Sequence, residues 1–391
     1  MYVLFIYTFF FGLTIYKIRD VKLNLYIKFT IIIFLIALFL RFNMGADIDN
    51  YIYFFDRVSS PIKDSFIYPG QRNVGFNALM YFSKIIVNDF RFFQLILNFI
   101  VISLCSYTVS KESDNTLLSL CLFIGSGIME VYYSSGLRQM QSMTIFFFAY
   151  FRFLQNKYYF KYYLFAIIAC LFHEAALVTL IIPIFSVFEE KISRNEKVLI
   201  LGIILSALFS VLFSPVIMFL TEVIPNFTVF THVLRYMSSN SFSLIGLLLR
   251  IVIFVFVYSM YKISKIDDRF VRIQIYTCYF SFIFYICLCQ FSLSARVSDF
   301  VDIITIITIP NLIIHIKSNL LQKFYLLFLF LLNFVLLYTD INFKLPSIVG
   351  NQHNPKYSTN YTLGDYEYVN VFNQNVDEYI DNVYYWIETT K

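Results

Sequence analysis

The sequence has little charge and few of the residues that interrupt helices. Only 14% of its 391 residues are Asp, Glu, Lys or Arg, and it contains just 8 Pro and 11 Gly. Hydrophobic residues make up 59% of the chain, with 48 Phe and 31 Tyr among them. A soluble domain cannot bury that much apolar surface, whereas a membrane protein exposes it to lipid. The composition therefore argues against a soluble protein and predicts mostly continuous membrane helices.

Signals for secretion and for disulfides are missing. The first apolar run, 3–16, has no basic segment before it and no small-residue cleavage site after it, so it is predicted to be a retained span. All six cysteines stand inside apolar runs, which argues against a disulfide framework and leaves the redox compartment open. They are Cys105, Cys121, Cys170, Cys278, Cys287 and Cys289.

Motifs for several common chemistries are absent as well. The sequence contains no P-loop, dinucleotide fingerprint, serine nucleophile elbow or metal-ligand spacing. Its basic residues are scattered over short loops and form no patch of the kind that binds nucleic acid. We therefore expect no cofactor, no metal and no nucleic-acid partner.

Apolar runs near the length needed to cross a bilayer, about 20 residues, recur along the chain. They cover roughly 2–17, 24–42, 90–109, 117–135, 138–155, 197–214, 243–263, 270–290, 296–315 and 323–339. The run 159–188 is too long for one upright helix. Because His173-Glu174 lies at its middle, it is predicted to form two short helices that meet at a break.

Basic loops orient the helices, because Lys and Arg concentrate on the cytoplasmic side. Placing all the basic loops inside requires the segment 75–86 to be re-entrant or interfacial, and about twelve spans then remain with both termini outside. The expected fold is all-α and polytopic. Its predicted parts are a transmembrane domain at 1–340, outer loops at about 43–74 and 214–241, and a non-cytoplasmic tail at 341–391.

This topology gathers cationic and titratable side chains on the outer face. Charge near a bilayer core is costly, so such groups are candidates for a binding site. They are Arg41, Arg72, Arg138, His173 and Arg296. An Arg that reaches toward the lipid headgroups is the alternative interpretation, and for Arg41 alone it is the favoured one.

The sequence around each candidate suggests its chemistry. Asp47, six residues after Arg41, can bind sugar hydroxyls or orient that arginine. The guanidinium fork of Arg138 suits bidentate phosphate contact. His173 can move a proton near neutral pH, and Glu174 can modulate it.

Further charged residues are secondary candidates or have simpler explanations. Arg296 and Asp299 are close enough to pair along one helix, which would leave that helix end neutral. Lys84 and Arg250 are interpreted as snorkelling or packing residues. The secondary candidates for the site are Glu130, Glu174, His232, Arg235 and Asp299.

Taken together, these residues resemble the EpsG family of bacterial membrane proteins, which is similar to Wzy-type O-antigen and capsule polymerases. The first block of the pattern is an Arg, a Gly-x-Asp, a Tyr and a later Gly-Phe. The second is an Arg that opens an aromatic span and a Phe-His further on. The third is an Arg, an aromatic and a Pro. In this chain the blocks are Arg41, Gly45, Asp47, Tyr51 and Gly75-Phe76; Arg138 and Phe172-His173; and Arg296, Phe300 and Pro310.

The chain departs from the family pattern at three positions. Asn73 stands where an acidic residue is common before the Gly-Phe, Asp299 where an aromatic often follows the last Arg, and Ala175 where a hydroxyl is frequent after the His. These departures concern the contacts to the acceptor more than the class of reaction.

The resemblance implies a metal-independent glycosyltransferase in the bacterial inner membrane, with its active site facing the periplasm or the exterior. Such a polymerase transfers a growing glycan from undecaprenyl pyrophosphate onto a lipid-linked repeat unit, in lipopolysaccharide or capsule synthesis. The implied partners are the undecaprenyl pyrophosphate-linked oligosaccharide, membrane lipids and a chain-length regulator protein. The implied roles are His173 or Asp47 as the base and Arg41, Arg72, Arg138, Arg296 and Tyr51 in substrate binding.

Two other classes of function stay open at this point. A transporter or flippase of lipid-linked oligosaccharide would use charges at mid-membrane, with Asp302 and Glu130 along its path. An O-antigen ligase shares the outward His and Arg residues. An O-acyltransferase would show its own His and Asp/Asn signatures, which are not found.

Overall fold

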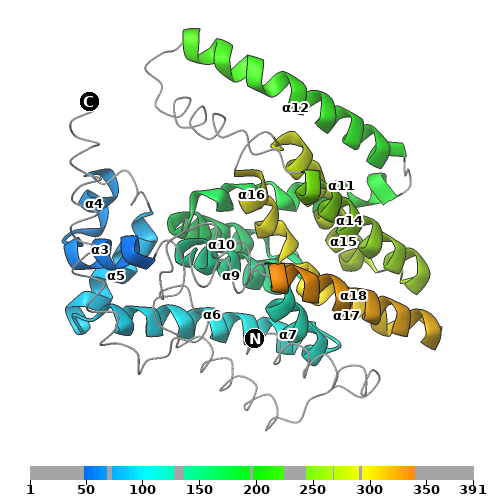
Figure 1. Ribbon diagram of the computed structural model, residues 1–391, viewed down its shortest axis with the longest axis horizontal. Helices are drawn as coiled ribbons and strands as arrows, with labels where there is room; N and C mark the ends of the chain where they lie inside the picture. Colours follow the sequence, from blue (N-terminus) through cyan, green and yellow to red (C-terminus); the bar gives the residue numbers. More distant parts are fainter. Residues whose placement is uncertain are drawn as a thin grey trace. The chain divides into compact units, whose positions relative to one another are not determined.

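A computed structural model describes residues 48–67, 73–126, 136–193, 197–223, 244–266, 268–289 and 293–339 (Figure 1). Within these residues the chain is helical and contains no strand. The described helices include five that are long and apolar enough to cross a membrane. They are Phe90–Glu112, Gly246–Ser264, Arg269–Cys287, Arg296–Ile314 and Asn319–Leu336. The protein is therefore an all-helical membrane protein, while the expected total of about twelve spans stays a prediction.

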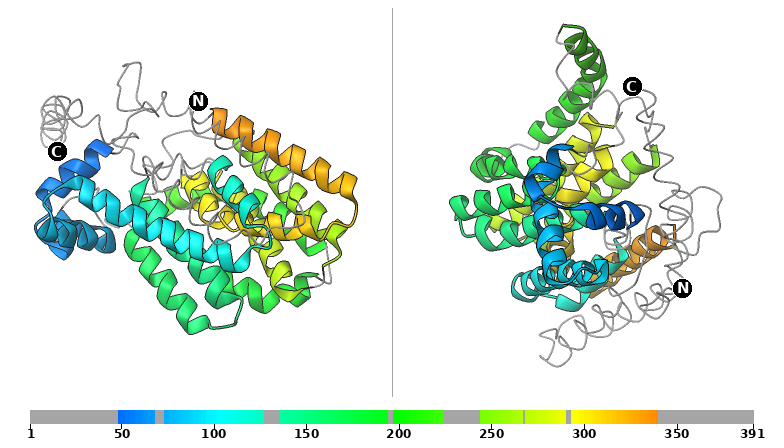
Figure 2. Two further views of the ribbon diagram at one scale, coloured as in Figure 1. Left: turned by 90° about the horizontal axis from the view of Figure 1, so that it is seen from below. Right: turned by 90° about the vertical axis from the view of Figure 1, so that its left-hand side faces the viewer.

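The chain divides into two compact units, which are described separately. The first contains 1–148, 168–174 and 324–391, and the second contains 149–167 and 175–323. Helices of the first unit are α3 (Ile48–Arg57), α4 (Pro61–Ile67), α5 (Val74–Ile86), α6 (Phe90–Glu112), α7 (Thr116–Gly125) and α9 (Leu137–Ala149), which ends one residue past the boundary. Figures 1 and 2 show α3, α4 and α5 gathered at the start of α6.

In the second unit, α15 (Arg269–Cys287) is the central helix. It packs against α11 (Ile182–Ser193), α12 (Lys197–Val223), α14 (Leu244–Ser264) and α16 (Leu293–Asp302), and α17 (Thr305–Ile314) packs against α14. The second unit also contains the π-helical turn Tyr150–Leu154 and the 3₁₀ helix Glu174–Leu180. The first residue of that 3₁₀ helix, Glu174, belongs to the first unit. Two helices, α10 (Tyr159–Phe172) and α18 (Asn319–Thr339), contain residues of both units.

The predicted break in the run 159–188 is confirmed. Helix α10 ends at Phe172, His173 is not helical, and a 3₁₀ helix and α11 follow. The predicted span 296–315 matches the candidate span Arg296–Ile314, which contains a turn at 303–304. Helix α16 ends at Asp302 and α17 begins at Thr305. Between them the amide of Ile304 donates to the carbonyl of Val301, three residues back, and the Thr305 hydroxyl donates to the Asp302 carbonyl at 2.6 Å.

Two segments that were predicted to be outer loops are more helical than the sequence suggested. Helix α12 runs to Val223, past its predicted end at 214, with Pro215 inside it. The loop predicted at 43–74 contains α3 and α4. Tyr51 and Phe55, four residues apart on α3, are both buried, as is Val58 directly after the helix, so the gain from their burial stabilises this segment. Helix α5 has 13 residues and is about 20 Å long, too short to cross a ~30 Å core.

The cysteines agree with the sequence analysis, and the structure adds a polar cap at the start of α6. All six cysteines are free, as expected. Helix α6 is capped by Asp89, whose carboxylate accepts from the Arg91 amide at 2.8 Å. The Arg91 guanidinium also donates to this carboxylate at 2.9 Å, and that bond, together with the amide bond, holds the pKa of Asp89 below its ordinary value of 3.8.

The cap of α6 gives a prediction about stability. Asp89→Ala is expected to lower the free energy of unfolding by about 1 kcal/mol, because an orphan helix amide loses its acceptor. The contribution of the Asp89 carboxylate to the free energy of unfolding is complete above its pKa in the unfolded chain, about 3.8. It is lost as the pH falls below that value, since the pKa of Asp89 is lower in the folded protein. Thermal unfolding of the purified wild type and variant in detergent measures this loss of stability. Asp89→Asn, which keeps a capping oxygen, should retain most of the stability at neutral pH, and equal losses in both variants would contradict the assignment.

Candidate functional site

Arg138 opens helix α9 in the first unit. Its guanidinium carbon lies 5.7 Å from the centroid of the Tyr51 ring, within the range of a cation–π contact. Tyr51 comes from α3 and is only 3% exposed. The two side chains are far apart in sequence, and the fold places the cation over an aromatic face.

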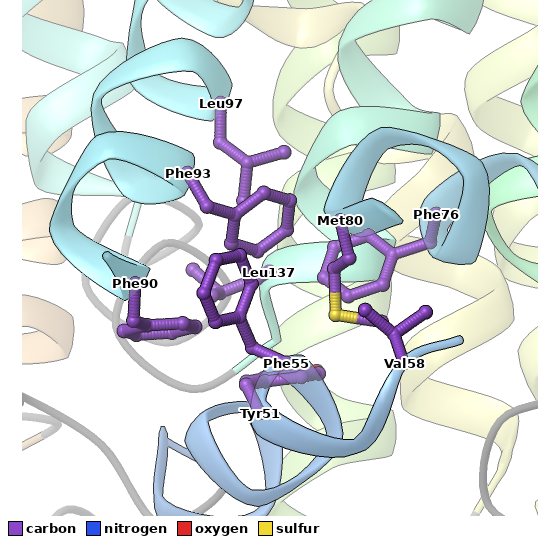
Figure 3. Close-up of a cluster of buried hydrophobic side chains, with 9 residues drawn as sticks. All are labelled: Tyr51, Phe55, Val58, Phe76, Met80, Phe90, Phe93, Leu97 and Leu137. Atoms are coloured by element: carbon purple, nitrogen blue, oxygen red, sulfur yellow. The ribbon is translucent and has the colours of Figure 1, made fainter. Parts of the chain in front are cut away.

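A cluster of apolar side chains holds Tyr51 in place (Figure 3). We call these residues the aromatic cluster; they are Tyr51, Phe55, Val58, Phe76, Met80, Phe90, Phe93, Leu97 and Leu137. The ring centroids of Tyr51 and Phe76 are 5.5 Å apart, and those of Phe76 and Phe93 are 5.4 Å apart in an edge-on arrangement. Such tilted pairs add to the energy of burial. Because Leu137 belongs to the cluster, packing also fixes the first turn of α9, where Arg138 lies.

His173 follows the last residue of α10 and is 8% exposed. Its backbone amide donates to the Ala169 carbonyl at 3.1 Å, and Phe172 packs against the aromatic cluster. The hydroxyl of Ser142, on α9, donates to the same Ala169 carbonyl at 2.6 Å. This bond joins α9 to the last turns of α10.

The Ser142–Ala169 bond and the aromatic cluster together place Arg138 and His173 near each other within the first unit. Arg138 precedes Ser142 by four residues, and His173 follows Ala169 by four. Leu137, next to Arg138, is a member of the aromatic cluster, and Phe172, next to His173, packs against it. Both residues therefore lie beside the same cluster, at one end of the part of the α9–α10 pair that the first unit contains.

Gly75 brings α5 against the end of α10. A Cβ atom at this position would lie 3.0 Å from both the Cβ and the carbonyl oxygen of Leu171, which is closer than nearly all real contacts. Any larger residue would push on the backbone next to Phe172 and His173. A glycine here therefore permits the close approach that brings Phe76 into the aromatic cluster.

The second unit contains Arg296, on α16, with its side chain exposed. Phe300, on the same helix, is fully buried, and Pro310 is buried in α17. Asp299 forms an ion pair with Arg250 of α14, and Arg250 also pairs with Asp302. Among the residues that the structure describes, no three His, Cys, Asp or Glu side chains are grouped as metal ligands would be.

A comparison of the sequence with models of protein families shows which family the chain belongs to. The model of the EpsG family matches residues 24–355. The chain is a member of the EpsG family. Searches of curated proteins and of solved structures found no significant match. The resemblance predicted from the sequence is thus confirmed, and the protein belongs with Wzy-like, polymerase-type membrane proteins that serve polysaccharide metabolism.

In this EpsG protein the fold brings parts of the first two sequence blocks together. Tyr51 and Gly75-Phe76 come from the first block, and Arg138 and Phe172-His173 come from the second. Glu174 is exposed and begins the 3₁₀ helix. The third block lies in the second unit. Other predicted residues lie outside the described part of the chain; they are Arg41, Gly45, Asp47, Arg72, Glu130, His232 and Arg235.

The interpretation of Arg250 as a snorkelling or packing residue is wrong. Its side chain is only 12% exposed and is paired with two carboxylates. The sequence did contain a signal. An Arg well inside the apolar run 244–264 and two Asp residues three apart on another helix carry complementary charge, and charges at membrane depth are normally paired.

Proposed function

We propose that this EpsG family protein is a polysaccharide polymerase. In the proposed reaction, a growing glycan moves from undecaprenyl pyrophosphate to the non-reducing end of a new lipid-linked repeat unit. The observation that carries this proposal is the gathering of Arg138, Tyr51 and His173 at one end of the α9–α10 pair, within a family of Wzy-like proteins.

The chemistry needs a group that stabilises the departing anion. As the bond between the donor sugar and the pyrophosphate breaks, negative charge builds on the pyrophosphate oxygens. A guanidinium can bind two of these oxygens at once, and the buried Tyr51 ring limits where that guanidinium lies. Arg138 is therefore assigned to the pyrophosphate, and Arg41, Arg72 and Arg296 are proposed as further cations on the substrate.

The acceptor sugar hydroxyl must lose its proton as the new glycosidic bond forms. An imidazole accepts such a proton near neutral pH. His173 is the proposed base, because α10 and Phe172 fix its place and because Phe172 packs against the aromatic cluster that contains Leu137, the neighbour of Arg138. Asp47 is the second candidate and His232 the third. Arginines supply the charge that bound metals supply elsewhere, so no metal is assigned to the reaction.

The location and the partners follow from this proposal. The site is placed on the outer face of a bacterial inner membrane, where the lipid-linked repeats are polymerised. The substrate is an undecaprenyl pyrophosphate-linked oligosaccharide, and exposed apolar helix faces such as that of α12 suit contact with lipid. A chain-length regulator protein is the proposed protein partner.

A complementation experiment tests the function. In a strain that lacks the gene, surface polysaccharide should consist of single repeats, and the wild-type gene should restore long chains. His173→Ala should lower the rate of elongation by about 100- to 10,000-fold, the usual contribution of a general base, and leave single repeats. Gel electrophoresis of the polysaccharide measures chain length.

The control for this experiment is Lys161→Ala, which changes an exposed residue of the same helix, α10, that has no assigned role, and it should leave long chains. Lipid-linked repeats that accumulate on the cytoplasmic side would instead indicate a flippase. Free polymer that is not attached to its final acceptor would indicate a ligase. Long chains in the His173→Ala strain would remove His173 from the site.

A further inference from the structure

The second unit contains a group of charged side chains that has no direct role in the proposed reaction. We call Arg250, Asp299 and Asp302 the charge triad. Nη2 of Arg250 contacts Oδ1 of Asp299, and Nη1 contacts Oδ2 of Asp302. The side chains are 12%, 20% and 13% exposed. The guanidinium carbon of Arg250 also lies 5.6 Å from the centroid of the Tyr285 ring, on α15.

The geometry of the triad ties α16 to α14. Asp299 and Asp302 are three residues apart, so both lie on the same side of α16. The planar fork of one guanidinium can bind two carboxylates through different nitrogens, which a single ammonium group matches less well. Because the groups are largely shielded from solvent, removing one partner leaves an uncompensated charge and is strongly unfavourable.

Helix α16 is also fastened to α15. The Ser281 hydroxyl donates to the Ser298 carbonyl at 3.2 Å, and the Ser298 hydroxyl donates to the Ser281 carbonyl at 3.4 Å. Both serines are buried, as is Phe300. A helix of only ten residues is thus fixed by ion pairs on α14 and by reciprocal hydrogen bonds on α15.

Arg296 lies on this same short helix, three residues before Asp299, and its side chain is exposed. The backbone at Arg296 can move only if α16 moves. The position of the exposed Arg296 side chain therefore depends on the charge triad, whose two Asp residues lie less than two helical turns from it.

We propose that Arg250 is a positioning residue: through Asp299 and Asp302 it fixes α16 so that Arg296 is held toward an anionic group of the substrate. This inference rests on the proposed function, in which Arg296 binds the lipid-linked pyrophosphate. Arg250 itself does not touch the substrate.

A double-mutant cycle tests the positioning role. The full-length protein is purified into lipid nanodiscs and supplied with the lipid-linked repeat unit of its host, and the rate of linkage formation is measured. Arg250→Ala is expected to lower kcat/KM by about 100-fold, the effect of a misplacement of about 1 Å at a reacting group. Arg296→Ala should have a similar effect, and the double variant should be no worse than the more severe single variant, since both remove the same contribution. Losses that multiply would show that Arg250 has only a structural role and would overturn the inference.

A charge exchange keeps the test valid if Arg250→Ala does not fold. Arg250→Asp combined with Asp302→Arg again places one cation between two carboxylates. The kcat/KM of this double variant should be at least about tenfold higher than that of Arg250→Asp alone, because the pairing is restored. A folded exchange variant with no recovery would contradict the inference. Arg272→Ala removes a guanidinium from the neighbouring α15 and is the matched control, with unchanged kcat/KM.

The two proposals fail in different ways. A wild-type protein that forms no linkage overturns the proposed function and this inference with it. If the wild type is active but the losses of kcat/KM in Arg250→Ala and Arg296→Ala multiply in the double variant, only the positioning role is overturned.

Discussion

Arg138→Ala is expected to stop chain elongation while the protein still inserts into the membrane. The guanidinium is the proposed partner of the leaving pyrophosphate, and removal of one preorganised donor to developing charge costs about 100- to 1,000-fold in rate. Arg138→Lys keeps the charge but loses the planar fork, so it should recover only part of that loss. The measurement is the length distribution of surface polysaccharide in a deletion strain that carries each variant.

The control for Arg138 is another arginine on the continuation of the same helix. Arg152 lies in the π-helical turn that follows α9 and is exposed. Arg152→Ala should leave chain length unchanged. Immunoblots of membranes must show equal amounts of each variant. Long chains in the Arg138→Ala strain at normal protein level would show that Arg138 is not part of the catalytic machinery.

Gly75→Val should be nearly as damaging, although Gly75 carries no chemistry. A Cβ at this position already lies 3.0 Å from the Leu171 backbone oxygen, so a branched side chain must push α5 away from the end of α10. Phe76 and Phe172 would then lose contact with the aromatic cluster, and His173 would shift. A shift of about 1 Å costs roughly 100-fold in rate, and the overpacking itself costs about 1–3 kcal/mol of stability. Chain length in cells and thermal unfolding in detergent measure the two effects.

A graded series and a second glycine separate these effects. Gly75→Ala needs a displacement of only a few tenths of an ångström, so elongation should slow without stopping. Gly202→Ala on α12 creates a conflict with the Tyr279 hydroxyl in the second unit and should reduce stability without shifting His173. Equal rates of elongation in the wild type and the Gly75→Val variant would contradict the argument that close approach of α5 positions the site.

Local features of the sequence were enough to predict several helices and the break between two of them. The apolar runs predicted α6, α14, α15 and α18 to within a few residues at each end. The break at His173 was predictable because His and Glu at the centre of an apolar run are costly within a membrane helix. The run 296–315 predicted the candidate span Arg296–Ile314, but the turn at 303–304 inside it was not predicted, since hydropathy does not indicate bonds such as that from the Thr305 hydroxyl to the Asp302 carbonyl.

The candidate site could be predicted as a set of residue types and not as an arrangement. Arg138, Tyr51 and His173 were each identified from sequence, and Gly75-Phe76 was identified from the family pattern. Nothing in the sequence could show that the Arg138 guanidinium lies over the Tyr51 ring, or that Gly75 meets Leu171. The contacts depend on how each helix is rotated about its axis and how it packs against its neighbours, which hydropathy does not encode.

By itself, the sequence determined that this protein is an all-helical membrane protein of the EpsG family, because composition and the spacing of apolar runs are properties of the chain alone. Only the tertiary structure decided which charges meet. It paired Arg250 with Asp299 and Asp302, and it placed Arg138 and His173 beside one aromatic cluster. The physical reason is that a charge shielded from water must find a partner, and only the packed helices determine which partner is within reach.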